Sequence, residues 1–219
     1  MENESIADND SRIDNAVGGD EVALSELFDE HRARLRRMVE LRMDRRLKGR
    51  IDPSDVLQDA YVDLAKQLPN YAAKPDLPFF VWLRRITGQR LSMLHRHHLG
   101  AAKRNAGIEV GIFRSIPEAS SIFLAAQLVG KLTTVTQALR RDERQTMLMS
   151  ILEDLEEDDR EIIALRHFEH MNISEIAAQY EISEAAAGMR HLRALRKMKK
   201  LLGDHPDHFD SIADFGRDN

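Results

Sequence analysis

The chain has 219 residues, of which 42% are hydrophobic and 32% are charged, and its formal net charge at pH 7 is −5. This charge argues against a protein that coats nucleic acid along its whole surface, because such proteins are usually basic. The absence of cysteine excludes disulfides, a thiolate nucleophile and cysteine-ligated zinc. No apolar run is long enough to cross a bilayer and no signal-peptide pattern opens the sequence, so we expect a cytoplasmic protein without membrane contact.

Aromatic residues make up only 5% of the chain, and glycine and proline number 11 and 6. This composition predicts an all-α fold, and the length suits two small helical domains joined by a linker. Basic residues are concentrated in the segments His31–Arg50, Arg84–Arg104 and Arg190–Lys200. Localised basic faces on an acidic chain indicate contact with an anionic polymer at defined places.

The predicted first domain covers residues 20–104, and the acidic segment 1–19 before it is expected to be disordered. Leu24, Leu27 and Phe28 begin a run of apolar residues at helical spacing. This run predicts the first helix of the domain.

Two further helices are predicted in this domain. Asp52 and Pro53 form a strong helix start, with Asp52 as the N-cap and Pro53 in the first helical position. We expect Pro69, Pro75 and Pro78 to break the chain after this helix, and a third helix to run from about Phe79. Trp82, on the third helix, is interpreted as a core residue rather than a surface for stacking bases.

Helical periodicity weakens over residues 105–145, which are expected to form a linker. The predicted second domain covers residues 146–202. An acidic tail over 203–219 follows and is expected to be disordered. The tail shields the basic surface of the second domain, contacts a regulator, or is simply solvated.

The second domain carries the spacing of a helix-turn-helix. Ser174 is expected to cap a short helix, Ile182 to fill the turn, and Ser183 to cap a long second helix. Glu181 stands in the turn where a glycine is common, so the bend has to tolerate a residue with a β-carbon.

The long second helix is predicted to carry a basic stripe. Its cations step by three, four and three residues along the sequence: Arg190, Arg193, Lys197 and Lys200. Such a helix can pack on its domain and still offer cations to a major groove, although simple solvation of the stripe is the alternative. The segment Glu184–Met189, which would read base edges, is mostly alanine, so base readout is expected to be sparse.

Three segments, in this order, resemble bacterial RNA polymerase sigma factors. Asp52–Tyr61 is similar to the region that docks on the clamp coiled coil of the polymerase. Phe80–Leu91 resembles the region that recognises and melts the downstream promoter element, and Leu155–Leu202 resembles the domain that reads the upstream element. The two-domain organisation is most similar to the extracytoplasmic-function (ECF) class, and Thr87–Leu91 is similar to a subgroup common in planctomycete-like bacteria.

The resemblance implies a subunit that binds core RNA polymerase and promoter DNA, nucleates strand opening, and has no catalytic residues, metal or cofactor of its own. It assigns polymerase docking to Asp55, Leu57, Gln58, Asp59 and Asp63. It assigns contact with the downstream element to Arg84, Arg85, Gln89, Arg90, Arg96, Lys103 and Arg104. It assigns contact with the upstream element to Ser183, Glu184, Ala186, Arg190, Arg193, Lys197 and Lys200. A regulator such as an anti-sigma protein is a further expected partner, and the free protein is expected to be monomeric.

Other functions have less support. His95 and His98 approach a common helix face, but no carboxylate or thiolate stands at ligand spacing, so no metal site is expected. No glycine-rich phosphate loop and no set of nucleophile, base and acid indicates an enzyme. The rival hypothesis is a conventional helix-turn-helix transcriptional regulator. It explains residues 173–202 equally well but not the Asp52–Asp63 segment or the basic third helix.

Overall fold

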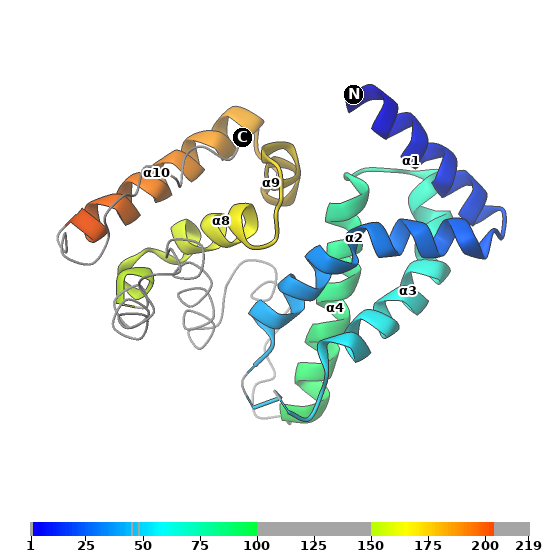
Figure 1. The fold of residues 1–219 in the computed structure, drawn as a ribbon, viewed down its shortest axis with the longest axis horizontal. Coiled ribbons are helices and arrows are strands. Elements are labelled where there is room, and N and C mark those ends of the chain that lie inside the picture. Colours follow the sequence, from blue (N-terminus) through cyan, green and yellow to red (C-terminus); the bar gives the residue numbers. More distant parts are fainter. Residues whose placement is uncertain (1, 45, 48, 100–149, 204–219) are drawn as a thin grey trace, which may run out of the picture. The chain divides into compact units, whose positions relative to one another are not determined.

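The computed structural model describes residues 2–44, 46–47, 49–99 and 150–203 (Figure 1). Every regular element in these ranges is a helix, which confirms the predicted all-α fold. The chain divides into two compact units whose main boundary falls between residues 113 and 114. None of the helices in the described ranges is long and apolar enough to cross a membrane.

The first unit contains α1 (Glu2–Val17), α2 (Glu21–Arg42), α3 (Pro53–Ala73) and α4 (Phe79–Leu99). Helices α2, α3 and α4 pack against one another, and α1 packs on α2 and α3. The core is formed by apolar side chains with at most 2% of their surface exposed, among them Leu27, Phe28, Leu35, Met38, Val56, Ala60, Leu64, Leu68, Phe80, Leu83 and Leu91. The predicted helices are therefore those that build the core.

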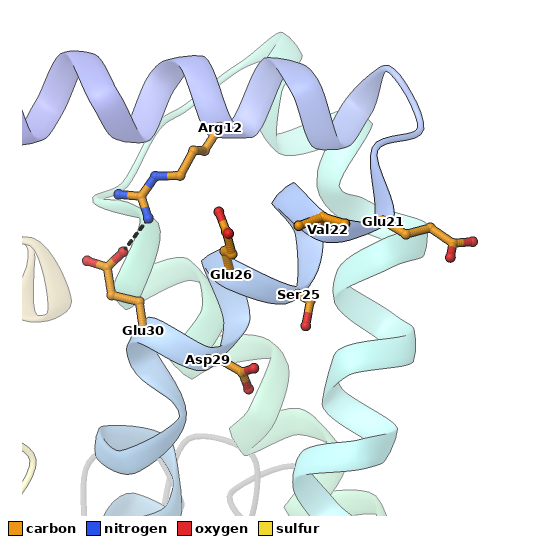
Figure 2. A pocket seen from close by; sticks show the side chains of 7 residues that line it. All are labelled: Arg12, Glu21, Val22, Ser25, Glu26, Asp29 and Glu30. Atoms are coloured by element: carbon orange, nitrogen blue, oxygen red, sulfur yellow. Dashed lines mark hydrogen bonds and ion pairs between the residues drawn. The ribbon is translucent and has the colours of Figure 1, made fainter.

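Helix α1 corrects the expectation that residues 1–19 are disordered. Ile13 on α1 is only 6% exposed, so the helix buries an apolar contact. The Arg12 guanidinium donates a hydrogen bond to the Glu30 carboxylate on α2 at 2.9 Å, at one side of a pocket along these helices (Figure 2). Both contacts need a partner distant in the sequence. The acidic composition of residues 1–19 does not reveal such partners, and for this reason it suggested disorder.

The turn between α1 and α2 consists of a left-handed glycine followed directly by the cap of α2. Gly19 has a φ of 97°, a left-handed conformation that glycine adopts without steric cost. The Asp20 side chain then accepts hydrogen bonds from the backbone N–H groups of Val22 and Ala23, at 2.9 and 3.2 Å. Asp20 thus supplies the cap of α2 directly after the turn.

Helix α3 begins as predicted. The Asp52 carboxylate accepts a hydrogen bond from the Ser54 N–H at 2.7 Å, and the Asp55 carboxylate accepts one from the Asp52 N–H at 3.2 Å. The Asp52 side chain also accepts from the backbone N–H of Asp55, so Asp52 and Asp55 form a reciprocal capping box, and Pro53 occupies the first turn. The structure confirms Asp52 as the N-cap.

Pro69 does not break the chain as predicted, because it lies inside α3, which continues to Ala73. Tyr71 holds the last turn in place: its hydroxyl donates a hydrogen bond to the Leu77 carbonyl at 2.8 Å. Its ring stacks on Trp82 of α4, with the ring centroids 4.4 Å apart. These tertiary contacts offset the hydrogen bond that a proline removes from a helix interior.

The second unit contains α8 (Glu157–His167), α9 (Ile173–Tyr180) and α10 (Glu184–Gly203). Helix α10 packs on α8. The core of the second unit is formed by apolar side chains with at most 4% of their surface exposed, including Ile162, Leu165, Phe168, Ile176, Ala177, Ala187, Ala194 and Met198. Ala187, Ala194 and Met198 thus form the apolar face by which α10 packs in this core.

A histidine ties the end of α4 to the loop after α2. The backbone N–H of Asp44 donates a hydrogen bond to His95 Nε2 at 3.3 Å, which requires an unprotonated Nε2. Burial lowers the pKa of His95, and this effect outweighs the attraction of its proton to Asp44, while Arg46 lowers the pKa further. The neutral imidazole is the form that fits the folded state.

Acidification is therefore expected to destabilise the first unit. The unfolded chain binds a proton at His95 near the ordinary pKa of 6.5, above the lowered folded value, so the free energy of unfolding falls as the pH drops through this range. Thermal midpoints measured at about pH 7.5 and about pH 5.5 should differ less in His95→Gln than in the unsubstituted chain. The exposed neighbour His97 provides the control His97→Gln. An equal pH effect in both variants would contradict a role for His95.

Candidate nucleic-acid interface

The short helix of the helix-turn-helix is capped by Asn172 and not, as predicted, by Ser174. The Asn172 side-chain carbonyl accepts hydrogen bonds from the Glu175 N–H and from the Ser174 hydroxyl, both at 2.7 Å. The Glu175 carboxylate in turn accepts one from the Asn172 N–H at 2.9 Å. This capping box starts α9 at Ile173, and it places Ser174 inside the first turn.

The turn between α9 and α10 contains a left-handed residue that is not glycine. Glu181 has a φ of 56°, so a residue with a β-carbon occupies the left-handed region. The Ile182 N–H donates a hydrogen bond to the Ala177 carbonyl at 3.0 Å, which closes the end of α9. The Ser183 hydroxyl then accepts a hydrogen bond from the Ala186 N–H at 3.2 Å. Both the bend at Glu181 and the cap at Ser183 are as predicted.

Helix α10 presents two faces of different character. Ala187, Ala194 and Met198 are at most 1% exposed and hold the helix on its unit. Met189 and Leu192, on the opposite side by helical spacing, are 48% and 45% exposed. Exposed cations accompany them along the helix: Arg190, Arg193, Arg196, Lys197, Lys199 and Lys200.

Arg196 and Lys199 were missed by the sequence reasoning. The predicted stripe is one row of cations at steps of three and four, whereas the exposed surface of α10 covers a wider arc. Their spacing from Leu192, by four and seven residues, was the available signal. The basic surface of α10 is thus broader than the predicted stripe.

Lys197, predicted to contact DNA, is engaged by carboxylates of its own unit. Its ammonium forms an ion pair with Asp159, on α8, and another with Glu156 at 3.2 Å. These carboxylates raise the pKa of Lys197, the hydrogen bond with Asp159 having the largest effect. The Lys197 side chain remains 47% exposed, so a phosphate can compete for it. Arg193, Arg196, Lys199 and Lys200 form no ion pair within the described part of the chain.

The N-terminal end of α10 offers few groups to base edges. The Ser183 hydroxyl is occupied as a cap, Glu184 is exposed and Ala186 is half-buried. His191 lies one turn further along, and its Nε2 is 3.0 Å from His167 Nε2 on α8. Burial, followed by the nearby Arg166, lowers the pKa of His191. This histidine therefore links α10 to α8.

The residues predicted to dock on polymerase all lie on α3. Asp55 and Gln58 are exposed, and the Asp59 side chain is 50% exposed. Leu57 is only 1% exposed and lines a pocket of about 370 Å³ with Phe28, Tyr61 and Gln58. The structure thus brings acidic and polar groups together beside a partly apolar hollow between α2 and α3, but Leu57 offers almost no surface to a partner.

Asp63 and Arg90, assigned to different functions by the sequence, bind each other. The Arg90 Nε donates a hydrogen bond to the Asp63 carboxylate at 2.9 Å, and a second guanidinium nitrogen forms an ion pair with the same oxygen. Asp59 lies 4.0 Å from Arg90 Nε. The hydrogen bond with Asp63 is the largest cause of the raised pKa of Arg90. This pair joins α3 to α4, and its side chains are only partly exposed, Asp63 at 18% and Arg90 at 24%.

The remaining residues assigned to the downstream element are dispersed. Gln89 and Arg96 are exposed on α4, and Arg85 is half-buried. Arg84, predicted to contact DNA, has no exposed surface and so offers no group to DNA in this fold. Packing of α4 against both α2 and α3 places Arg84 inside the unit. Lys103 and Arg104 lie outside the described residues.

The aromatic side chains at the start of α4 are part of the core. Phe79 and Phe80 are 5% and 2% exposed. Trp82 is half-buried against Tyr71, as its stacking shows. Across the described ranges, no three His, Asp or Glu side chains gather in a way that would hold a metal ion.

The capped α9, the bend at Glu181 and the cationic α10 together define a DNA-binding helix-turn-helix protein. Residues 151–200 match the family model of sigma-70 region 4. The RNA polymerase sigma-H factor of Pseudomonas aeruginosa is 24% identical over 151 residues, which are 69% of this chain and 73% of that protein. These matches support a sigma factor, with region 4 in the second unit.

A solved structure has a similar fold over most of the chain. It is described as CnrH in complex with the cytosolic domain of CnrY. That chain is 22% identical with a TM-score of 0.52, and the alignment covers 90% of this chain and 98% of that chain. The likeness agrees with the helical architecture of both units.

Release of Lys197 is expected to strengthen DNA binding by the second unit. Asp159→Asn removes the main competitor for its ammonium, and because an ion pair of a solvated lysine contributes little, affinity for duplex DNA should rise only roughly two- to fivefold. The salt dependence should steepen by about one phosphate contact. Fluorescence anisotropy at several salt concentrations measures both quantities.

Asp154→Asn provides the matched control, because Asp154 is exposed, lies in the same acidic stretch and loses the same charge. Equal gains in both variants would show a general charge effect. A loss of affinity in Asp159→Asn would show that the ion pair instead holds α10 in its binding orientation.

Proposed function

We propose that this chain is a sigma factor of the ECF class, of the subgroup common in planctomycete-like bacteria. In this proposal it binds core RNA polymerase, recognises promoter DNA and nucleates strand opening. The observation that carries the proposal is the region 4 match in the second unit, joined to a first unit with an acidic α3 and a basic α4. A conventional regulator needs no such first unit.

Core docking is assigned to the exposed edge of α3. Asp55 and Gln58 support it because they are exposed, and Asp59 because its side chain is 50% exposed, beside the hollow lined by Phe28 and Tyr61. An acidic edge with an apolar neighbour suits a basic coiled coil. Asp63 is withdrawn from this surface, because its carboxylate holds Arg90. Asp55 also has a structural role in the capping box of α3.

Strand opening is assigned to a complex with polymerase and not to this chain alone. Opening about ten base-pair steps costs about 14 kcal/mol at ~1.4 kcal/mol per step. Capture of two or three bases returns only about 1 to 3 kcal/mol each. Gln89 and Arg96 support a role in strand capture because they are exposed on α4, with Arg85 beside them. Arg90 would also be able to contact the strand once its ion pair with Asp63 is broken.

Recognition of the upstream element is assigned to α10. Arg190, Arg193 and Lys200 are exposed and suit contacts with phosphates, which position a protein on the duplex. The short side chains at the start of the helix leave sequence discrimination to methyl contacts and DNA shape. This element is therefore expected to be read less strictly than one contacted by several bidentate side chains.

A protein regulator is also proposed. The similar solved chain, CnrH, is described in complex with the cytosolic domain of CnrY. By analogy, an anti-sigma protein would bind this chain, which is proposed to be a cytoplasmic monomer when free.

Reversing the charge of Asp59 is expected to weaken core binding. Like charges facing each other across an interface cost several kcal/mol, so Asp59→Lys should reduce affinity for core polymerase about tenfold or more. Pull-down with purified core enzyme measures the loss. Asp76→Lys, at an exposed site in the loop before α4, is the control for net charge. Unchanged binding in Asp59→Lys would place the docking surface elsewhere.

The function itself is tested by adding the purified chain to bacterial core polymerase with a pool of promoter fragments. A sigma factor is expected to direct new, specific start sites that core polymerase alone does not use. A conventional regulator would bind DNA well by itself and would block transcripts made by another holoenzyme. The absence of new start sites, together with such blocking, would contradict the proposal.

A further inference from the structure

The outward face of α10 combines cations with two large apolar side chains. Met189 and Leu192 are 48% and 45% exposed, and Arg193, Arg196 and Lys199 are exposed beside them. DNA phosphates suit the cations, but exposed Met and Leu side chains gain most from an apolar partner. This face therefore fits a ligand that is both acidic and apolar.

The segment that follows α10 in the sequence has this chemistry. Residues 204–219 contain five aspartates and one arginine, which gives a formal charge of −4. They also contain Phe209, Ile212 and Phe215, spaced three residues apart. Met189 and Leu192 are likewise three apart. Apolar anchors at such spacing are typical of segments that lay one apolar face on a partner.

We propose that residues 204–219 dock on the outward face of α10 and compete there with DNA. The apolar anchors of the segment cover Met189 and Leu192, and its aspartates pair with Arg193, Arg196 and Lys199. The contact lowers the affinity of the second unit for promoter DNA until polymerase or another ligand displaces the segment. The regulatory consequence rests on the proposed function, whereas the contact itself does not.

The tether makes the contact feasible. From Gly203 back to Met189 is 14 residues of helix, or about 21 Å at 1.5 Å per residue. An extended chain of 16 residues reaches roughly 53 Å, so residues 204–219 can turn back over this face. A short tether gives an effective concentration in the millimolar range, so a weak contact is enough to compete with DNA.

A second copy of the chain fits this face less well. Helix α10 carries six Lys and Arg residues and one Glu, so two such faces would repel each other. The acidic segment neutralises the same cations. Charge complementarity thus favours the chain's own segment over self-association.

The contact is tested first without DNA. A fluorescein-labelled peptide of residues 204–219 is titrated with a chain that lacks those residues, and anisotropy reports binding. Met189→Ala with Leu192→Ala is expected to weaken the peptide about fivefold or more, the usual loss on truncating an anchor. Met93→Ala, at a 49% exposed methionine of α4, is the control. Circular dichroism checks that each variant keeps its helices.

A scrambled peptide of the same composition separates docking from charge attraction. If it binds as well as the natural order and the Met189 and Leu192 substitutions have no effect, the proposed docking is wrong. Absence of binding by the natural peptide would overturn it as well. Concentration-dependent dimerisation of the shortened chain, lost on Leu192→Ala, would show that a second copy occupies the face instead.

The competition is tested with duplex DNA. Removal of residues 204–219 is expected to raise DNA affinity severalfold, and Phe209→Ala with Phe215→Ala in the full chain should reproduce most of that gain without changing the charge. Equal DNA affinity of the full and shortened chains would overturn the competition. Because peptide binding uses neither polymerase nor promoter, its outcome is independent of whether the chain directs transcription.

Discussion

The packing of α4 against α2 and α3 determines which side chains of the first unit can meet a partner. It draws Arg84 and the start of α4, including Phe80, into the core. It also sets Arg90 at the edge of α3, where Asp63 binds it, and leaves Gln89 and Arg96 exposed. Helix α4, which the sequence predicts to be a basic helix, thereby offers only a narrow polar surface.

Each unit uses a carboxylate of its own to hold a cation that nucleic acid would otherwise attract. Asp63 holds Arg90 in the first unit, and Asp159 holds Lys197 in the second. A ligand that engages the carboxylate releases the cation, so binding at the two groups is coupled by linkage. In the first unit the acidic edge of α3 is the surface proposed for polymerase. Asp59, which belongs to that surface, lies 4.0 Å from Arg90 Nε. Polymerase docking at Asp59 would thus remove one of the two carboxylates near Arg90 and favour its release to the DNA strand.

Local sequence signals predicted the helix starts that depend on local hydrogen bonds. Asp52 and Ser183 cap their helices as expected, because a cap needs only a backbone N–H two or three residues away. One error is local, because Asn172 and not Ser174 caps α9. The other errors lie where partners distant in the sequence decide the structure. Helix α1 depends on Glu30 of α2, and the passage of α3 through Pro69 depends on contacts of Tyr71 with Leu77 and Trp82. The burial of Arg84 likewise depends on two neighbouring helices, which helical periodicity alone cannot reveal.

Site-specific crosslinking within a transcribing complex tests the central claim most directly. A photoreactive amino acid is placed at Gln58 on α3 and, in a second variant, at Gln89 on α4, both at exposed positions. The sigma-factor account predicts that position 58 crosslinks to a large subunit of core polymerase and that position 89 crosslinks to promoter DNA only after strand opening. Failure of position 58 to reach any polymerase subunit, together with crosslinking of position 89 to duplex DNA in the absence of polymerase, would contradict it.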